Sequence, residues 1–157
     1  MQSNVYAFMN NLREAERSCR EAIKFNDRLA NSKQKILYEV DLLSQLAQVI
    51  ASKDRQGECL GYLARGRQLL SSFPEEHGHL AFNYNTTAEK LRAVGRLSES
   101  SGYCEQVIRM QLQKKIPRSQ AVFAHVLMMR ISKAQHRPVL EQLEHSWMAL
   151  DKTVSLG

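Results

Sequence analysis

One stretch of this chain recurs 41 residues later, and the repeat restricts the possible folds more than any other feature. Residues 47–62 align with residues 88–103, and Ile50 matches Leu91 in kind. A period of about 20–50 residues is typical of proteins built from stacked structural units, which present long surfaces to partners. The positions identical in both copies are Ala47 and Ala88, Arg55 and Arg96, Glu58 and Glu99, and the pairs Gly61-Tyr62 and Gly102-Tyr103.

The composition favours an all-α fold. The 157 residues include only 7 Gly and 3 Pro, and 43% of them are hydrophobic. Alternating runs rich in Val, Ile and Thr, which would indicate strands, are missing from the sequence. The length is typical of one domain, so the sequence predicts a single helical-repeat domain over residues 1–157.

The spacing of apolar residues predicts about seven helices joined by short connections. Apolar side chains recur at steps of three and four residues, which places them on one helical face. Pro74 with the following acids predicts the start of the fourth helix, and Gly95 predicts its end. The predicted helices span residues 3–26, 28–53, 55–72, 74–94, 98–115, 118–135 and 138–150.

These helices pair as a long A helix followed by a shorter B helix, and the pairs resemble tetratricopeptide repeats. The family pattern places a large residue, a small one and an apolar one in helix A, then a turn, then small and apolar residues in helix B. The interval of 41 is longer than the family's usual 34, and the family's proline after helix B is missing. The matching positions are Tyr84, Ala88, Leu91, Gly95, Ser100, Cys104 and Val107 in one copy, Leu43, Ala47, Ile50, Asp54, Cys59, Leu63 and Gly66 in the preceding copy, and Ala124, Met128, Ile131, Leu140, Leu143 and Trp147 in a looser third copy.

The resemblance covers about residues 12–150, and it implies an α-solenoid of antiparallel helix hairpins. Long, degenerate copies of this kind are similar to those in bacterial regulator sensor domains and secretion chaperones. The first copy supplies only a B helix, over residues 15–23. Either an N-terminal helix caps the stack, or the chain is a fragment of a longer repeat array.

The resemblance also implies where a partner binds. In such stacks the concave face is lined by A-helix residues that lie off the packing stripe. We therefore expect six residues to be more exposed than Tyr84, Ala88 and Leu91 and to line one groove for a protein or peptide. They are Phe82, Asn85, Glu89, Arg92, His125 and Met129.

Cysteine and charge usage suggest an intracellular, cytoplasmic protein. The three widely spaced cysteines do not form a disulfide framework, and neither a signal peptide nor an apolar run long enough to span a membrane is recognisable. The net charge of +6 suggests an acidic partner or nucleic acid. The basic residues are scattered among acidic ones, however, and this pattern favours an ordinary solvated surface over a binding patch. The predicted helix from Val139 to Leu150 carries Glu141 and Glu144 and no Lys or Arg, unlike a DNA-recognition helix.

No pattern in the chain predicts catalysis, a cofactor or a metal site. His77 and His79 have no third ligand at suitable spacing, and they read as a solvated connection between helices. Cys104 occupies a packing position, so a buried, unreactive thiol is favoured over a nucleophile. The sequence therefore predicts a non-enzymatic scaffold or adaptor that binds a partner protein. The alternative is a sensor or regulatory segment of a transcriptional regulator, with direct or indirect nucleic-acid contact.

Overall fold

The described part of the chain is helical and contains no strand. The computed structural model describes the backbone of residues 2–50 and 53–134, and the side chains of residues 11–50 and 54–134. The elements are α1 (Gln2–Asp27), α2 (Lys33–Val49), the 3-10 turn η1 (Lys53–Arg55), α3 (Gln56–Leu70), α4 (His77–Ala93), α5 (Leu97–Leu112) and α6 (Arg118–Ala134).

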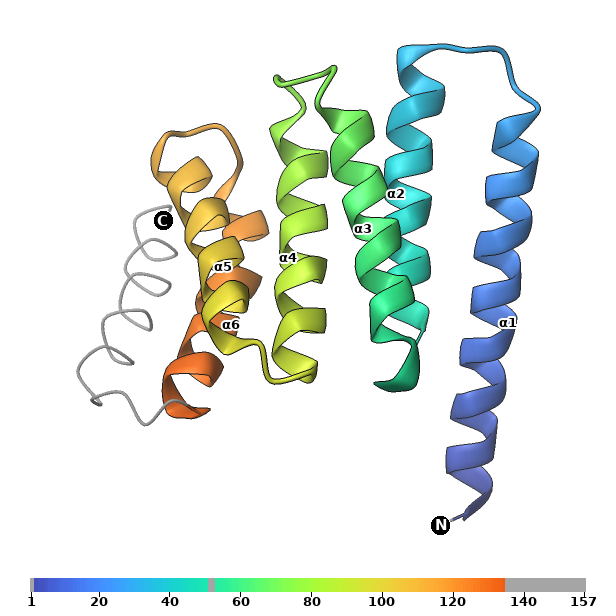
Figure 1. The fold of residues 1–157 in the computed structure, drawn as a ribbon, viewed down its shortest axis with the longest axis horizontal. Coiled ribbons are helices and arrows are strands. Elements are labelled where there is room, and N and C mark those ends of the chain that lie inside the picture. The colour runs from blue at the N-terminus through green and yellow to red at the C-terminus, as the bar shows by residue number, and fades with distance from the viewer. Residues whose placement is uncertain (1, 51–52, 135–157) are drawn as a thin grey trace, which may run out of the picture. The chain divides into compact units, whose positions relative to one another are not determined.

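The chain divides into two compact units, residues 1–79 and residues 80–157. In the first unit α2 packs between α1 and α3, and neighbouring helices run in opposite directions (Figure 1). In the second unit α5 packs against α6, and α4, α5 and α6 also alternate in direction (Figure 1). Short connections force this alternation, because a chain that leaves one helix must turn back to cover its apolar side.

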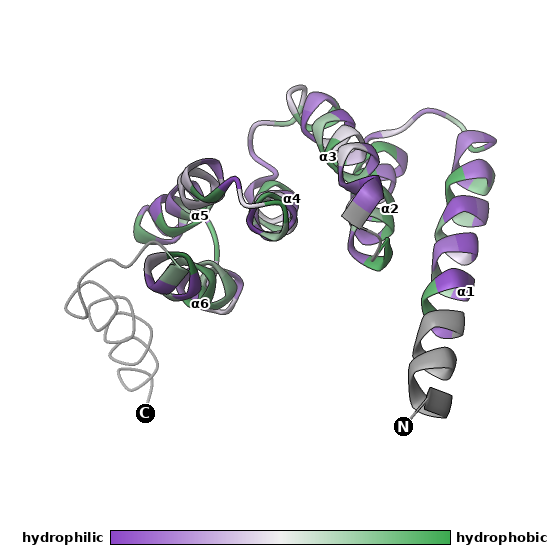
Figure 2. Ribbon diagram, turned by 60° about the horizontal axis from the view of Figure 1, so that its bottom comes forward, coloured by the Kyte–Doolittle hydropathy of each residue, from purple (hydrophilic) through white to green (hydrophobic). Residues whose placement is uncertain are grey.

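Each unit has its own apolar core. In the first, α2 and α3 bury Leu46, Ala47 and Leu63, and Cys19 and Ile23 of α1 pack against them. In the second, small residues of α4 and α6, such as Ala88 and Ala124, share a core with α5. The described part of α1 is largely hydrophilic, whereas the other helices carry hydrophobic residues along one side (Figure 2). Helix α1 is therefore held by a narrow apolar stripe.

Local signals explain most helix ends. The Ser32 hydroxyl accepts a hydrogen bond from the Lys35 amide at 3.1 Å, which caps the start of α2. Gly95 adopts a positive φ of 79°, and the amide of Arg96 bonds to the Leu91 carbonyl, so α4 ends in the Schellman motif. The predicted role of Gly95 as the cap of this helix is confirmed.

Two expectations from the sequence need correction. Helix α4 begins at His77 rather than at Pro74, so His77 and His79 lie in its first turn and not in a connection. Residues 30–32 precede α2, which is shorter than the predicted helix over 28–53. The expected seventh helix, with Leu140, Leu143 and Trp147, lies outside the described residues. The single domain and the repeat stack stay predictions.

Candidate functional site

The six candidate residues come from two helices of the second unit. Helix α4 contributes Phe82, Asn85, Glu89 and Arg92, at steps of three and four residues, which places them on neighbouring turns of one side. Helix α6 contributes His125 and Met129. Because α4 and α6 share a core of small residues, their backbones can approach closely.

Five of the six residues are partly exposed, and one is buried. Phe82, Asn85, Glu89, Arg92 and Met129 are partly exposed, whereas Ala88 and Leu91 are buried as expected. Tyr84 is partly exposed as well, contrary to the expected contrast with these residues, although its ring packs against the ring of Tyr103 with the centroids 5.2 Å apart.

The expectation that His125 is exposed is wrong, since only 3% of it is accessible. It lies on the side of α6 that carries Ala121, Ala124 and Met128, all of which are in the core. That side is broad because α6 contacts both α4 and α5, so it extends to His125. The candidate surface therefore consists of the α4 residues and Met129.

Asn85 already has a structural role. Its amide nitrogen donates a hydrogen bond of 3.0 Å to the Gln120 carbonyl, which ties α4 to the first turn of α6. Its Oδ1 atom is buried and accepts no hydrogen bond. The Nε atom of Arg92 is also buried, and it donates no hydrogen bond. Positions 85 and 92 are two turns apart, about 10 Å along the helix axis, so the unsatisfied acceptor and the unsatisfied donor belong to one side of α4. A buried polar atom without a partner is destabilising by about 1–3 kcal/mol.

The two sites weighed for chemistry behave as packing and surface groups. Cys104 is fully buried, and burial, with a smaller effect of Glu105, raises the pKa of its thiol to about 12. The thiol is therefore protonated at neutral pH, as expected for a packing residue. His79 lies 2.8 Å from Asp41 and pairs the start of α4 with α2. Within the described residues no group of three or more His, Cys, Asp or Glu side chains could hold a metal ion.

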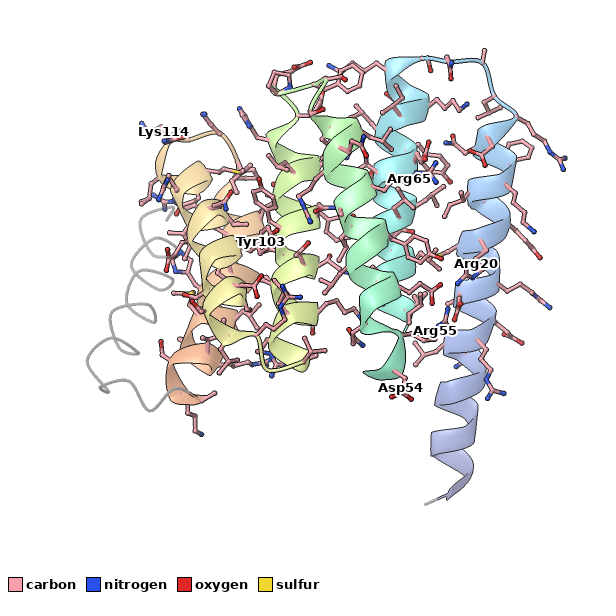
Figure 3. All side chains as sticks on the ribbon, in the orientation of Figure 1. Arg20, Asp54, Arg55, Arg65, Tyr103 and Lys114 are labelled. Atoms are coloured by element: carbon pink, nitrogen blue, oxygen red, sulfur yellow. The ribbon has the colours of Figure 1, made fainter. Side chains whose placement is uncertain are left out.

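A polar network in the first unit was not anticipated. At the start of α3, Arg55 binds both carboxylate oxygens of Glu16 at 2.9 and 2.7 Å, and its Nε donates to Glu58 at 2.7 Å. Arg20 donates to Glu58 at 2.7 Å and to the Tyr62 hydroxyl at 3.1 Å. Figure 3 shows Arg20 and Arg55 between α1 and the start of α3. The signal was present in the sequence, because Arg55, Glu58 and Tyr62 all recur in the second copy.

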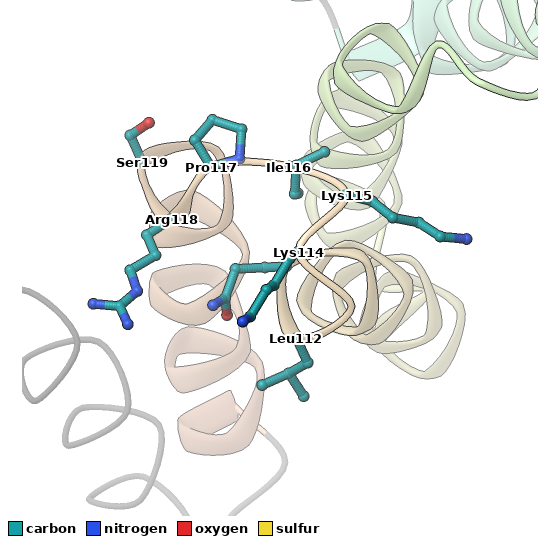
Figure 4. Close-up of a pocket in the computed structure, with 8 residues that line it drawn as sticks. Leu112, Lys114, Lys115, Ile116, Pro117, Arg118 and Ser119 are labelled. Carbon is teal, nitrogen blue, oxygen red and sulfur yellow. The ribbon is translucent and has the colours of Figure 1, made fainter.

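A surface hollow at the α5–α6 corner was also missed. Eight consecutive or nearly consecutive residues line it, and three of them are basic (Figure 4). The sequence contains a short basic run, Lys114 to Arg118, but offers no reason to expect a hollow there. The lining residues are Gln111, Leu112, Lys114, Lys115, Ile116, Pro117, Arg118 and Ser119.

Comparison with known proteins adds no further assignment. No family model, no curated protein and no solved structure matches the chain. Among the described residues, no helix has the length and apolar character required to cross a membrane.

Proposed function

We propose that this chain is a non-enzymatic, cytoplasmic scaffold or adaptor of the tetratricopeptide-like kind, which binds a partner protein through the side of α4 and α6 described above. The burial pattern supports this proposal, because buried positions of the first copy recur at the same offset of 41 in the second. Examples are Ala47 with Ala88, Ile50 with Leu91, and Leu63 with Cys104. Repeated hairpins of this kind place neighbouring A helices in register, and that arrangement produces continuous binding surfaces.

The pair of unsatisfied atoms on α4 carries the proposal. Oδ1 of Asn85 accepts no hydrogen bond, and Nε of Arg92 donates none. A polypeptide backbone offers donors and acceptors in alternation, so one extended segment can satisfy both atoms. Both side chains are partly exposed, and the occupant must displace the groups that cover these two atoms. The occupant is thus a peptide segment that gives an N–H to Asn85 and a carbonyl to Arg92.

Neighbouring side chains add specificity to this surface. Phe82 and Met129 are partly exposed and apolar, and Glu89 lies between Asn85 and Arg92 in sequence. Aromatic and Arg side chains dominate the energetics of protein interfaces, and Met adapts to apolar groups of different shape. We expect a partner with an apolar side chain for Phe82 and Met129 and a cationic group for Glu89.

The test is capture of partners by the immobilised full-length chain, followed by mass spectrometry, for the wild type and two charge-reversal variants. Arg92→Glu should remove the partners that the wild type retains, because it removes the donor and repels the acceptor. Arg109→Glu is the matched control, since Arg109 is exposed on α5, away from the proposed surface. Circular dichroism should be unchanged for both variants.

Asn85 is not a suitable target, because its hydrogen bond to Gln120 holds α6. If the partners survive Arg92→Glu but are lost with Arg109→Glu, the binding surface is on α5 and the assignment to α4 and α6 is wrong. If the wild type retains no protein above a matrix control, the scaffold function itself is rejected.

A further inference from the structure

The whole net charge of the chain lies in one stretch of the second unit. Residues 106–134 contain six Lys and Arg residues and no Asp or Glu, which equals the net charge of +6. The remaining residues hold 22 − 6 = 16 basic and 16 acidic side chains, so they are neutral overall. These six basic residues therefore form an acid-free stretch, whereas the other 16 are scattered among the acids as the sequence suggested. The six are Arg109, Lys114, Lys115, Arg118, Arg130 and Lys133.

Three of these cations surround the hollow between α5 and α6. Lys114 and Arg118 extend to the same side of the connection, whereas Lys115 points away from them (Figure 4). The first turn of α6, with Ser119, borders the same hollow. Amide groups at the start of a helix carry partial positive charge, so this edge adds to the attraction for an anion.

A buried acceptor in the hollow provides independent support. Gln111 lines the hollow and is only 9% exposed, and its Oε1 atom is buried without a hydrogen-bond partner. A fully deprotonated anionic group cannot satisfy this oxygen, because such a group only accepts hydrogen bonds. The occupant must therefore combine a negative group for the cations with a nearby N–H or O–H donor for Gln111.

The hollow is too open to bury a small molecule. Six of its eight lining residues are exposed, and only Gln111 and Ile116 are buried. Small-molecule sites bury roughly 70–90% of their ligand, so this hollow fits one side chain of a larger partner. Leu112, which is 58% exposed, and Pro117 offer apolar contacts for the residues beside that side chain.

We propose that the α5–α6 corner binds a phosphorylated serine or threonine side chain of a partner protein. The phosphate carries a charge of about −1.5 to −2 and pairs with Lys114 and Arg118. A backbone N–H next to the phosphorylated residue donates to Oε1 of Gln111, whereas the sugar-phosphate backbone of DNA has no donor for this oxygen. This site shares no residue with the surface proposed on α4 and Met129, and it stands whether or not that surface binds a partner.

The test measures binding of the full-length chain to a fluorescent degenerate peptide pool with a central phosphoserine. The same pool with serine and a single-stranded DNA of equal charge are the comparison probes. We expect the phosphorylated pool to bind about tenfold more tightly than the serine pool, which is a difference of about 1.4 kcal/mol. Excess inorganic phosphate should compete. Equal binding of the two peptide pools, or tighter binding of the DNA, would overturn the proposal.

Matched variants distinguish the site from general charge attraction. Lys114→Asn and Arg118→Gln should each abolish the preference for the phosphorylated pool, and Asn tolerates the positive φ of 56° at position 114. Lys133→Gln removes the same charge from the same basic stretch but should retain the preference, because Lys133 is exposed in the last turn of α6 and does not line the hollow. An equal loss with Lys133→Gln would show nonspecific attraction and contradict the proposal.

Gln111→Leu provides a variant that is expected to fold. It removes a buried, unsatisfied oxygen, so the melting temperature should stay the same or rise. The affinity for the phosphorylated peptide pool should nevertheless fall, while competition by inorganic phosphate on the Lys114 and Arg118 pair persists. An unchanged peptide affinity in this variant would reject the role of Gln111 and with it the choice of a peptide.

Discussion

The two copies of the 41-residue pattern bury many of the same positions but fill them with different chemistry, and at other positions, such as Leu43 and Tyr84, only the first copy is buried. Where α2 buries Leu42 and Leu46, α4 buries Asn83 and Thr87. The Thr87 hydroxyl donates to the Asn83 carbonyl at 2.8 Å, so its burial leaves no unsatisfied donor. A helix position can therefore stay buried when its apolar side chain is replaced by a polar one, provided that the polar group makes a hydrogen bond within the same helix. The matched pairs that are buried in both copies are Val40 and Ala81, Leu42 and Asn83, Leu46 and Thr87, Ala47 and Ala88, Ile50 and Leu91, Cys59 and Ser100, Leu63 and Cys104, Gly66 and Val107, and Leu70 and Gln111.

The B helices also begin alike and then differ in their surroundings. Arg55 precedes α3 and Arg96 precedes α5, and each binds the Glu three residues later, at 2.7 and 2.6 Å. Near the helix start this Glu is also favoured by the helix dipole. In the first unit α1 adds Glu16 and Arg20 to the pair. In the second copy, Glu99 forms an ion pair with Arg96 and with no other described residue. One local motif therefore serves as a helix start in one copy and as a helix-to-helix contact in the other.

The largest expected effect comes from overpacking the matched alanines. Ala47 and Ala88 are both 0% exposed, so Leu at either position must displace neighbouring side chains. Ala47→Leu and Ala88→Leu should each destabilise the protein by roughly 1–3 kcal/mol, as measured by urea denaturation. Ala64→Leu is the matched control, because Ala64 is exposed on α3. If only one of the two buried substitutions destabilises the protein, the copies are not equivalent at this position.

Periodicity was enough to predict most helices of this chain, because buried residues recur at helical spacing along each one. It did not predict the start of α4. Pro74 and the acids after it resemble a first turn, but Lys33 at the start of α2 binds Glu76 at 2.7 Å. The amide of His77 bonds to the Glu75 carbonyl, which closes a turn before the helix. These contacts depend on tertiary structure, and they hold the acids outside the helix.

The candidate surface was predictable only in part. Residues on α4 followed from their spacing, but the buried arc of α6 was wider than a repeat pattern suggests, and it included His125. The unsatisfied atoms of Asn85 and Arg92 depend on side-chain geometry, so no pattern could indicate them. The positive charge of residues 106–134 could have been found by counting acidic residues along the sequence, because this stretch contains no Asp or Glu.

A smaller effect is expected where α4 and α5 end in the same motif with different residues. Gly95 has a φ of 79° and Lys114 a φ of 56°, and in α5 the amide of Lys115 bonds to the Met110 carbonyl at 3.0 Å. No atom lies within 4 Å of a Cβ added at Gly95, so Gly95→Ala tests backbone strain alone. It should destabilise the protein by about 1 kcal/mol.

Lys114→Gly should act in the opposite direction. It relieves the strain of a positive φ but increases the entropy of the unfolded chain, so we expect a net stabilisation below about 1 kcal/mol. Thermal denaturation of both variants provides the measurement. A destabilised Lys114→Gly protein would mean that the lysine side chain contributes to the fold itself. A stabilised one would support retention of a strained lysine for binding.

The smallest effect concerns the paired glutamates, and it appears only in acid. Hydrogen bonds from Arg55, Arg20 and Tyr62 lower the pKa of Glu58 to about 2, and the bond from Arg96 lowers the pKa of Glu99. A carboxylate with a lowered pKa stabilises the fold above its unfolded pKa of about 4.3, and this contribution is lost as the pH falls toward the folded value. The fold should therefore lose stability between about pH 4.3 and pH 2 through Glu58.

Glu58→Gln should reduce that loss, as measured by urea midpoints across this range. Glu99→Gln should reduce it less, because the Glu99 side chain is 55% exposed against 33% for Glu58. Equal pH profiles for the two variants would show that the contact with α1 adds nothing to the shared motif.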